Sequence, residues 1–95
     1  MKIKQVEELV GITKKNIRFY EDQGLLEVKR AENGYREYSL NDVKRLQEIR
    51  LLRKLAINIE DMRQMYAGKK SLRSCLEYQV DEMERKKKNL VQVQA

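Results

Sequence analysis

Residues 11–39, GITKKNIRFYEDQGLLEVKRAENGYREYS, decide the fold of this chain. Thr13 is a residue type that caps helix N-termini, because its hydroxyl accepts a hydrogen bond from a free backbone N–H of the first turn. The sequence therefore predicts a helix from Lys14 to about Gln23. Gly24 ends that helix, since glycine readily adopts the left-handed conformation found after helix C-termini.

A shorter helix is predicted immediately before this segment. Its apolar residues recur at helical spacing and are Ile3, Val6, Leu9 and Val10. Gly11 follows them as a stop signal. Two short helices joined by the turn at 11–13 have the length pattern of a helix-turn-helix.

The segment after Gly24 predicts a β-hairpin. Residues 25–30 are extended in character, Asn-Gly at 33–34 is a strong short-range signal for a hairpin turn, and residues 35–38 return as a second strand. Alternation along the returning strand places Tyr35 and Glu37 on one face. Arg36 and Tyr38 lie on the other face of that strand. A two-stranded hairpin that follows a helix-turn-helix is a wing.

Two capping patterns and a serine predict three more helices. Ser39 with Asp42, and Asn58 with Asp61, resemble capping boxes. Ser71 caps a fifth helix that runs to near residue 93, about 34 Å long at about 1.5 Å per residue. The third helix has a buried stripe of Val43, Leu46, Ile49, Leu52 and Leu55, and the fourth has an apolar face of Ile59, Met62, Met65 and Tyr66, closed by Gly68.

The fifth helix has the spacing of a coiled coil. Seven positions alternate four and three residues apart, and five of them are apolar: Leu72, Leu76, Gln79, Met83, Lys86, Leu90 and Val93. The two polar residues, Gln79 and Lys86, indicate that the coiled coil is marginally stable or that they fix its register. Alternatively, a partner covers the aliphatic parts of their long side chains. One helix cannot bury so narrow a stripe on a small domain, so a second copy of the chain is expected to cover it. The sequence thus predicts a winged domain over 1–70 and a dimerisation helix over 71–95.

Composition limits the possible functions. The chain has 95 residues, 41% hydrophobic and 38% charged, with a net charge of +6, which suits one small domain and a polyanionic partner. One cysteine and no histidine exclude a disulfide framework, a zinc finger and a Cys/His or Ser/His catalytic pair. No apolar run has the length of a membrane span and no secretory segment opens the chain, so a cytoplasmic protein is expected. An enzymatic function has no supporting residues, and no cofactor is expected.

Three motifs resemble those of the bacterial MerR-type transcriptional regulators. They are Gly11-Ile12-Thr13 with Asn16-Ile17-Arg18-Phe19-Tyr20-Glu21, then Gly24-Leu25-Leu26, then Asn33-Gly34-Tyr35-Arg36-Glu37-Tyr38-Ser39. The resemblance runs from about residue 3 to residue 66 in order and with matching spacings, and the long helix after it also fits. It implies a mostly α fold, namely a winged helix-turn-helix with a short two-stranded wing and a long C-terminal coiled-coil helix.

The chain departs from the family pattern at a few positions. Phe19 stands where a tyrosine is frequent and lacks the hydroxyl that would bond a phosphate, a proline is frequent near Val28, and Ala56 stands where a glycine is frequent. Members of the family typically carry an effector-sensing region beyond the dimerisation helix, whereas this chain stops at Ala95. We expect a truncated form of a longer parent. The alternative is a regulator that senses nothing by itself.

The resemblance and the side-chain chemistry together predict a DNA-binding surface. Lys14 and Arg18 lie four residues apart on one face of the second helix, where they can reach base edges or phosphates in the major groove. Arg18 is the strongest candidate, because a planar guanidinium binds phosphate or guanine through two hydrogen bonds. A solvated basic face is the alternative, and for Tyr20 and Tyr38 a purely structural role. The full predicted set is Thr13, Lys14, Lys15, Asn16, Arg18, Phe19, Tyr20, Lys29, Arg30, Tyr35, Arg36 and Tyr38.

Two other features are expected to be structural. The basic run at 85–88 is flanked by Glu82 and Glu84 and should be a solvated face of the coil. Metal-sensing relatives use a cysteine near the start of the dimerisation helix, which is where Cys75 lies. A soft-metal site needs at least two sulfur or imidazole ligands, and the chain has one cysteine and no histidine. We therefore expect no metal site.

The expected function is a homodimeric transcription regulator that binds double-stranded DNA at a pseudo-palindromic promoter operator, with one recognition helix in each major groove. The resemblance implies that the protein bends or untwists an overlong promoter spacer for RNA polymerase. The alternative is an architectural or recombination-accessory DNA-binding protein with the same winged domain, which would bind with little sequence preference. An adaptor that acts through the coiled coil alone would have no affinity for DNA.

Overall fold

The computed structural model describes the backbone of residues 1–94 and the side chains of residues 1–88. The chain divides into two compact units, Met1–Lys54 and Leu55–Ala95, and each is described by itself. No helix among the described residues has the length and apolar character needed to cross a membrane.

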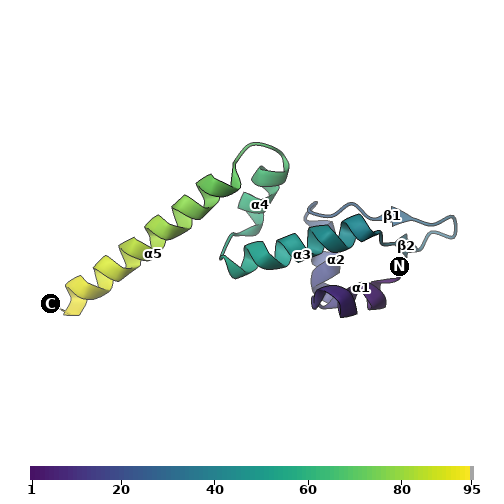
Figure 1. Ribbon diagram of the computed structural model, residues 1–95, viewed down its shortest axis with the longest axis horizontal. Helices are drawn as coiled ribbons and strands as arrows, with labels where there is room; N and C mark the ends of the chain where they lie inside the picture. Colours follow the sequence, from purple (N-terminus) through teal and green to yellow (C-terminus); the bar gives the residue numbers. More distant parts are fainter. Residues whose placement is uncertain (95) are drawn as a thin grey trace. The chain divides into compact units, whose positions relative to one another are not determined.

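The first unit contains the predicted helix-turn-helix (Figure 1). Helix α1 spans Ile3–Val10 and helix α2 spans Lys14–Asp22. Gly11 follows α1 with a φ of 68°, in the left-handed region where a glycine carries no steric penalty. Both helices and the glycine stop between them were predicted from the sequence and are confirmed.

A small core holds these helices against α3, which spans Leu40–Lys54. Helix α1 packs against both α2 and α3. Burying an aliphatic side chain contributes about 1.5–3 kcal/mol, so a few such residues suffice to fix the three helices. The buried apolar side chains of this unit include Val6, Val10, Ile17, Leu25, Leu26, Leu46 and Ile49.

The wing is shorter than the sequence predicted. Strand β1 is Lys29–Arg30 and strand β2 is Arg36–Glu37, paired antiparallel. Of the segment 25–30 that the sequence predicted as extended, only Lys29 and Arg30 form the strand. Leu25 instead continues from the end of α2, since its N–H donates to the Tyr20 carbonyl at 3.0 Å, and both Leu25 and Leu26 are buried. The chain reverses over residues 31–35, with the Gly34 N–H donating to the Ala31 carbonyl at 2.9 Å. The hairpin turn predicted at Asn33-Gly34 is confirmed, and Gly34 has a φ of 83° in the left-handed region.

A capping box starts α3 as predicted. The Ser39 N–H donates to the Asp42 carboxylate at 2.8 Å, and the Asp42 N–H donates to the Ser39 hydroxyl at 3.2 Å. The predicted stripe of α3 is buried from Val43 to Leu52, but the inclusion of Leu55 was wrong. Leu55 lies after the end of the helix and is 40% exposed.

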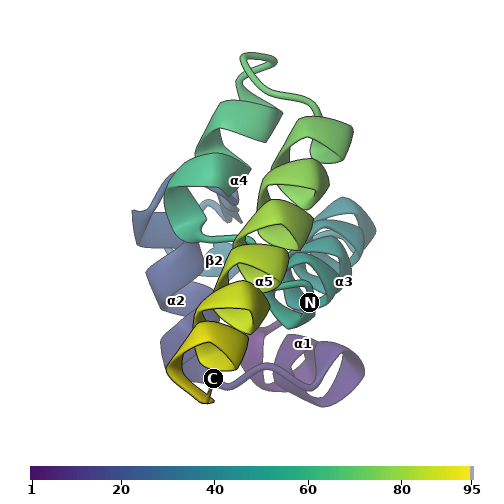
Figure 2. The same cartoon turned by 90° about the vertical axis from the view of Figure 1, so that its left-hand side faces the viewer.

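The second unit consists of α4, Ile59–Tyr66, and α5, Leu72–Gln94, joined by a short loop (Figure 2). Both predicted caps are confirmed, since the Asn58 side chain accepts from the Asp61 N–H at 2.8 Å and the Ser71 hydroxyl accepts from the Ser74 N–H at 3.0 Å. Lys70 in the loop donates to Asp61 at 2.8 Å, which raises the pKa of the Lys70 ammonium. The buried side chains of this unit include Ile57, Met62 and Cys75, whereas Ile59, Met65 and Tyr66 are half-buried.

Ala56 has a φ of 63°, in a region that side chains other than glycine rarely adopt. The left-handed conformation costs a non-glycine residue about 1–2 kcal/mol, although glycine also loses more chain entropy on folding. We therefore expect Ala56→Gly to raise the free energy of unfolding by about 1 kcal/mol, measured by urea titration of circular dichroism. Ala67→Gly is the matched control, because Ala67 has an ordinary φ of −82° at the end of α4. The control should lower stability, and a loss of stability in both variants would contradict the prediction.

Candidate nucleic-acid interface

The start of α2 is fixed by two hydrogen bonds to its backbone. The Asn16 N–H donates to the Thr13 hydroxyl at 3.3 Å, and the Lys14 N–H donates to the Glu7 carboxylate of α1 at 2.7 Å. Thr13 therefore acts as the predicted cap. Glu7 supplies a second acceptor that links the two helices of the motif, and no local sequence pattern indicated this bond.

One face of α2 anchors the helix, and the other is exposed. Ile17 is fully buried, whereas Lys14, Lys15, Asn16 and Arg18 are exposed. Because Ile17 fixes the rotation of the helix, this side presents three cations and an amide to the surroundings. These are the side-chain types that bind phosphates and base edges.

The two aromatic residues of α2 are placed differently. Phe19 is 43% exposed and Tyr20 is half-buried, and their ring centroids lie 5.8 Å apart in a tilted arrangement. This distance is typical of a favourable aromatic pair. Tyr20 thus packs against Phe19 and is partly exposed, so its contact with DNA stays a prediction beside the structural role.

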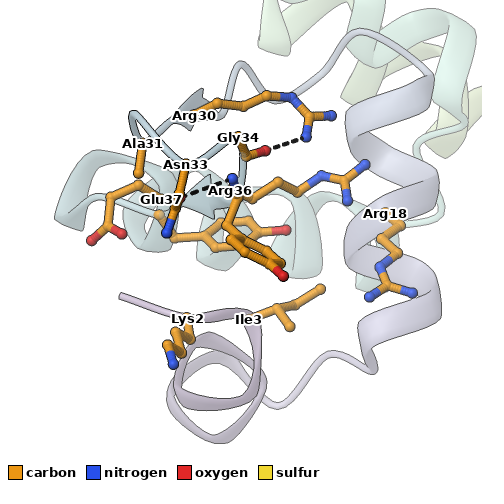
Figure 3. Close-up of a pocket in the computed structure, with 11 residues that line it drawn as sticks. Lys2, Ile3, Arg18, Arg30, Ala31, Asn33, Gly34, Arg36 and Glu37 are labelled. Atoms are coloured by element: carbon orange, nitrogen blue, oxygen red, sulfur yellow. Dashed lines mark hydrogen bonds between the residues drawn. The ribbon is translucent and has the colours of Figure 1, made fainter.

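A cavity of about 780 Å³ lies between α2, the wing and the N-terminal segment (Figure 3). Five of the predicted DNA-binding residues line it: Arg18, Arg30, Tyr35, Arg36 and Tyr38. Lys2 and Asn33, which were not predicted from the sequence, line it as well. Four cationic side chains against one carboxylate, that of Glu37, make this cavity basic. It therefore suits an anionic ligand.

Local hydrogen bonds hold the wing in shape. The Arg30 guanidinium donates to the Gly34 carbonyl at 2.9 Å, and the Tyr35 N–H donates to the Asn33 side chain at 3.2 Å. Both bonds are drawn in Figure 3. Tyr35 itself is 75% exposed on the wing. A large aromatic ring left in water on a projecting hairpin is suited to contact with a partner.

An ion pair connects the wing to α2. The Arg36 Nε atom donates to both carboxylate oxygens of Glu21, at 2.8 and 3.2 Å. The side chains are 32% and 18% exposed, respectively. The sequence predicted a site role for Arg36 but not for Glu21, because residues separated by 15 positions are brought together only by the tertiary fold.

Tyr38 lies in the core. It is 2% exposed, and its hydroxyl makes no hydrogen bond within the described part of the chain. Burial raises the pKa of this hydroxyl, and the nearby Glu21 carboxylate adds to the effect. The predicted contact between Tyr38 and DNA is therefore unavailable in this conformation. Its ring supports the wing instead, which was the structural alternative.

The first residue is bonded to the second strand of the wing. The Met1 ammonium donates to the Glu37 carboxylate and to the Tyr38 carbonyl, both at 2.8 Å, and the Tyr38 N–H donates to the Met1 carbonyl at 2.9 Å. The ammonium lowers the pKa of Glu37. These bonds bring Lys2 to the basic cavity, a position that no local sequence signal indicates.

The remaining predicted residues lie outside the cavity lining. They are Thr13, Lys14, Lys15, Asn16, Phe19, Tyr20 and Lys29. All except Tyr20, which is half-buried, are exposed. The structure thus divides the predicted set between α2 with its cap and the basic cavity, with Arg18 belonging to both, while Lys29 is exposed on β1 outside the cavity.

The second unit has an apolar face on α5. A shallow, open apolar groove along this helix is lined by Leu72, Leu76, Val80 and charged neighbours. Leu72, Val80 and Met83 are 43%, 53% and 60% exposed. Of the predicted seam, Leu76 and Gln79 are half-buried and Lys86 is exposed, while Leu90 and Val93 lie outside the residues whose side chains are described. Val80 was missed, although its spacing of four from Leu76 could have indicated it.

Charge is segregated along α5. Glu77, Asp81, Glu82 and Glu84 precede the basic run at 85–88. Two ion pairs, Arg73 with Glu77 and Arg85 with Glu82, join neighbouring turns of the helix. The segment up to Glu84 is therefore acidic and the following turn is basic.

Comparison with known proteins agrees with this arrangement. Residues 1–69 match the model of the MerR HTH family regulatory proteins. The chain belongs to the MerR family. It is 40% identical over 67 residues to the HTH-type transcriptional regulator HmrR of Rhizobium leguminosarum bv. viciae, a match that covers 70% of this chain and 52% of HmrR. It is also 40% identical over 62 residues to CueR of Escherichia coli O6:H1, covering 64% of this chain and 46% of CueR.

Solved MerR structures share the fold. The lead(II) complex of the regulator PbrR691 from Ralstonia metallidurans CH34 superposes with a TM-score of 0.85 at 24% identity, over 99% of this chain and 79% of that one. HiNmlR, a MerR regulator lacking the sensor domain and bound to promoter DNA, superposes with a TM-score of 0.68 at 21% identity, over 97% of this chain and 78% of that one. The chain spans about half the length of the HmrR and CueR relatives.

Proposed function

We propose that the chain is the DNA-binding and dimerising part of a bacterial transcription regulator. In this proposal a homodimer binds a pseudo-palindromic promoter operator in double-stranded DNA, and α2 is the recognition helix in the major groove. The observation that carries the proposal is the basic cavity, where Arg18 from α2 lies beside Arg30 and Arg36 from the wing. A wing that holds phosphates next to a recognition helix fixes the position of that helix on the duplex.

The family supports the regulatory function over the architectural alternative. HmrR and CueR are both transcriptional regulators, and HiNmlR is bound to promoter DNA. By analogy, the dimer distorts the promoter so that RNA polymerase can use it, with wing and phosphate contacts supplying the deformation energy. The protein then works in the bacterial cytoplasm at the nucleoid, with no catalytic activity of its own. We propose the domain boundary at residues 70 and 71, where Ser71 caps α5.

Dimerisation through α5 has support from its exposed apolar face. Leu72, Val80 and Met83 leave apolar area in contact with water, and a second copy of α5 would remove it. The segregated charges favour an antiparallel pair, because the acidic segment of one helix then faces the basic run of the other. A parallel pair would place like charges against each other.

Salt dependence tests the proposed function. If the cations of α2 and of the cavity bind phosphates, the logarithm of the association constant should fall linearly with the logarithm of salt concentration. The expected slope is about −0.9 for each phosphate bound. Fluorescence anisotropy of labelled duplexes at several salt concentrations measures this slope. A flat response would exclude phosphate binding, and equal affinity for the operator and for random duplexes would favour the architectural alternative.

A further inference from the structure

We propose that Glu21 is a positioning residue for DNA binding, which holds the Arg36 guanidinium so that its outer edge faces the phosphate backbone. This inference rests on the proposed function and assigns a role to a residue that is itself an anion. Glu21 lies in the last turn of the recognition helix, and Arg36 lies on β2 of the wing. The ion pair between them therefore connects the two elements that are expected to contact DNA.

The geometry leaves part of the arginine available. Only the Nε atom of Arg36 donates to Glu21, at 2.8 and 3.2 Å from its two carboxylate oxygens. Within the described residues, the two terminal nitrogens of this guanidinium make no hydrogen bond to the protein, and Arg36 lines the basic cavity. Arginine binds a phosphate through two parallel hydrogen bonds from a planar fork. The carboxylate thus occupies one donor and orients the others.

The negative charge of Glu21 is unexpected at a surface proposed to bind DNA. Glu21 follows Arg18 by three residues on α2 and lies close to a surface proposed to bind a polyanion, where an uncompensated negative charge would repel phosphates. It is only 18% exposed, and its charge is paired with Arg36. Asp22, the next residue, is exposed and is in none of the ion pairs of the described chain. The two neighbouring acids therefore differ in their contacts, not in their charge.

The ion pair adds a connection to α2 that the short strands of the wing do not supply. Strands β1 and β2 pair over only two residues each, and an isolated two-stranded hairpin is marginally stable. Figure 3 shows Arg36 extending from the hairpin toward the helix that carries Arg18. With the ion pair intact, the phosphate bound by Arg36 lies at a fixed distance from the bases and phosphates bound by α2.

The experiment compares Glu21→Ala with Asp22→Ala in operator binding. Each variant removes one negative charge from the last turn of α2, so simple electrostatics predicts slightly tighter binding for both. We expect Asp22→Ala to behave in this way. Glu21→Ala should instead weaken binding on the order of tenfold, a typical size for coupling between contacting residues. Its salt slope should also become shallower by about one for each phosphate that Arg36 no longer binds.

Arg36→Ala and the double variant Glu21→Ala/Arg36→Ala complete a double-mutant cycle for operator binding. If Glu21 acts through Arg36, the double variant binds as weakly as Arg36→Ala alone. Thermal unfolding of each variant, and hydrogen exchange of the Ala31 amide that donates to the Tyr35 carbonyl, report on the wing without DNA. Exchange at this amide should be faster in Glu21→Ala than in Asp22→Ala.

The possible results distinguish the positioning role of Glu21 from the proposed DNA-binding function on which it rests. Wild-type protein that binds the operator, with Glu21→Ala as tight as Asp22→Ala, overturns the positioning role and leaves the proposed function standing. Additive losses in the double variant overturn it as well. Wild-type protein that binds no DNA overturns the proposed function, and faster amide exchange in Glu21→Ala would then limit Glu21 to holding the wing in place.

Discussion

Arg18→Ala is expected to weaken operator binding by about 1–3 kcal/mol and to relax base preference at one symmetric position of the operator. Arg18 is exposed on α2, one turn after Lys14, on a helix whose rotation is fixed by the fully buried Ile17. A guanidinium on the exposed face of such a helix can donate two hydrogen bonds to one guanine. Without these bonds, both affinity and discrimination between bases decrease.

Arg36→Ala should behave differently, although its side chain lines the same cavity as Arg18. Arg36 belongs to the wing and is expected to contact phosphates, which are the same at every base pair. The variant should therefore weaken binding to all sequences alike and reduce the salt slope by about one for each phosphate that is no longer bound. The contrast between the two arginines separates base recognition from backbone binding.

The measurement is binding of wild type and both variants to the operator and to its single-base variants, at several salt concentrations. Lys69→Ala is a control, since Lys69 is an exposed cation in the loop between α4 and α5. Uniform weakening by both arginine variants would assign Arg18 to phosphate binding and leave Lys14, Lys15 and Asn16 to contact bases. No effect from either variant would refute the proposed docking.

Much of the fold followed from local sequence signals. The caps at Thr13, Ser39 and Asn58 each make the expected backbone hydrogen bond. Glycines 11 and 34 have the positive φ values that their positions require. Such signals act over three or four residues, so a single sequence carries them completely. The bounds of the strands were predicted less well, because residues 25–28 lie outside the short pairing of Lys29–Arg30 with Arg36–Glu37.

The candidate site was predicted less completely, because it depends on contacts between distant residues. Cationic and aromatic side chains on a helix and a hairpin could be selected by type. Glu21, Glu7 and Lys2 could not, since their roles depend on the partners that the fold supplies. Tyr38, in contrast, was selected as a DNA contact by its residue type, but its side chain is buried. Alternation in the strand placed it correctly opposite Tyr35, but no local signal indicated that its face is buried.

Leu76→Asp is expected to abolish dimerisation. Leu76 is half-buried and lies beside Leu72 and Val80 on the apolar face of α5, so in a dimer Asp at this position would place a carboxylate among apolar side chains of the interface. Moving a carboxylate out of water into an apolar interface costs several kcal/mol, and the apolar contact of Leu76 is lost as well. Sedimentation or light scattering at tens of micromolar should show a dimer for wild type and a monomer for the variant.

Tyr78→Asp provides the matched control. Tyr78 is 54% exposed on the same helix, but two residues from Leu76, and so about 200° around the helix axis. The substitution removes a large apolar side chain and adds the same charge, yet it should leave the dimer intact. Because each half of a symmetric operator is bound by one copy, the Leu76→Asp monomer should also lose most of its operator affinity while keeping its salt slope per half-site. A wild-type monomer, or equal dissociation by both variants, would show that the Leu72–Leu76–Val80 face is not the interface.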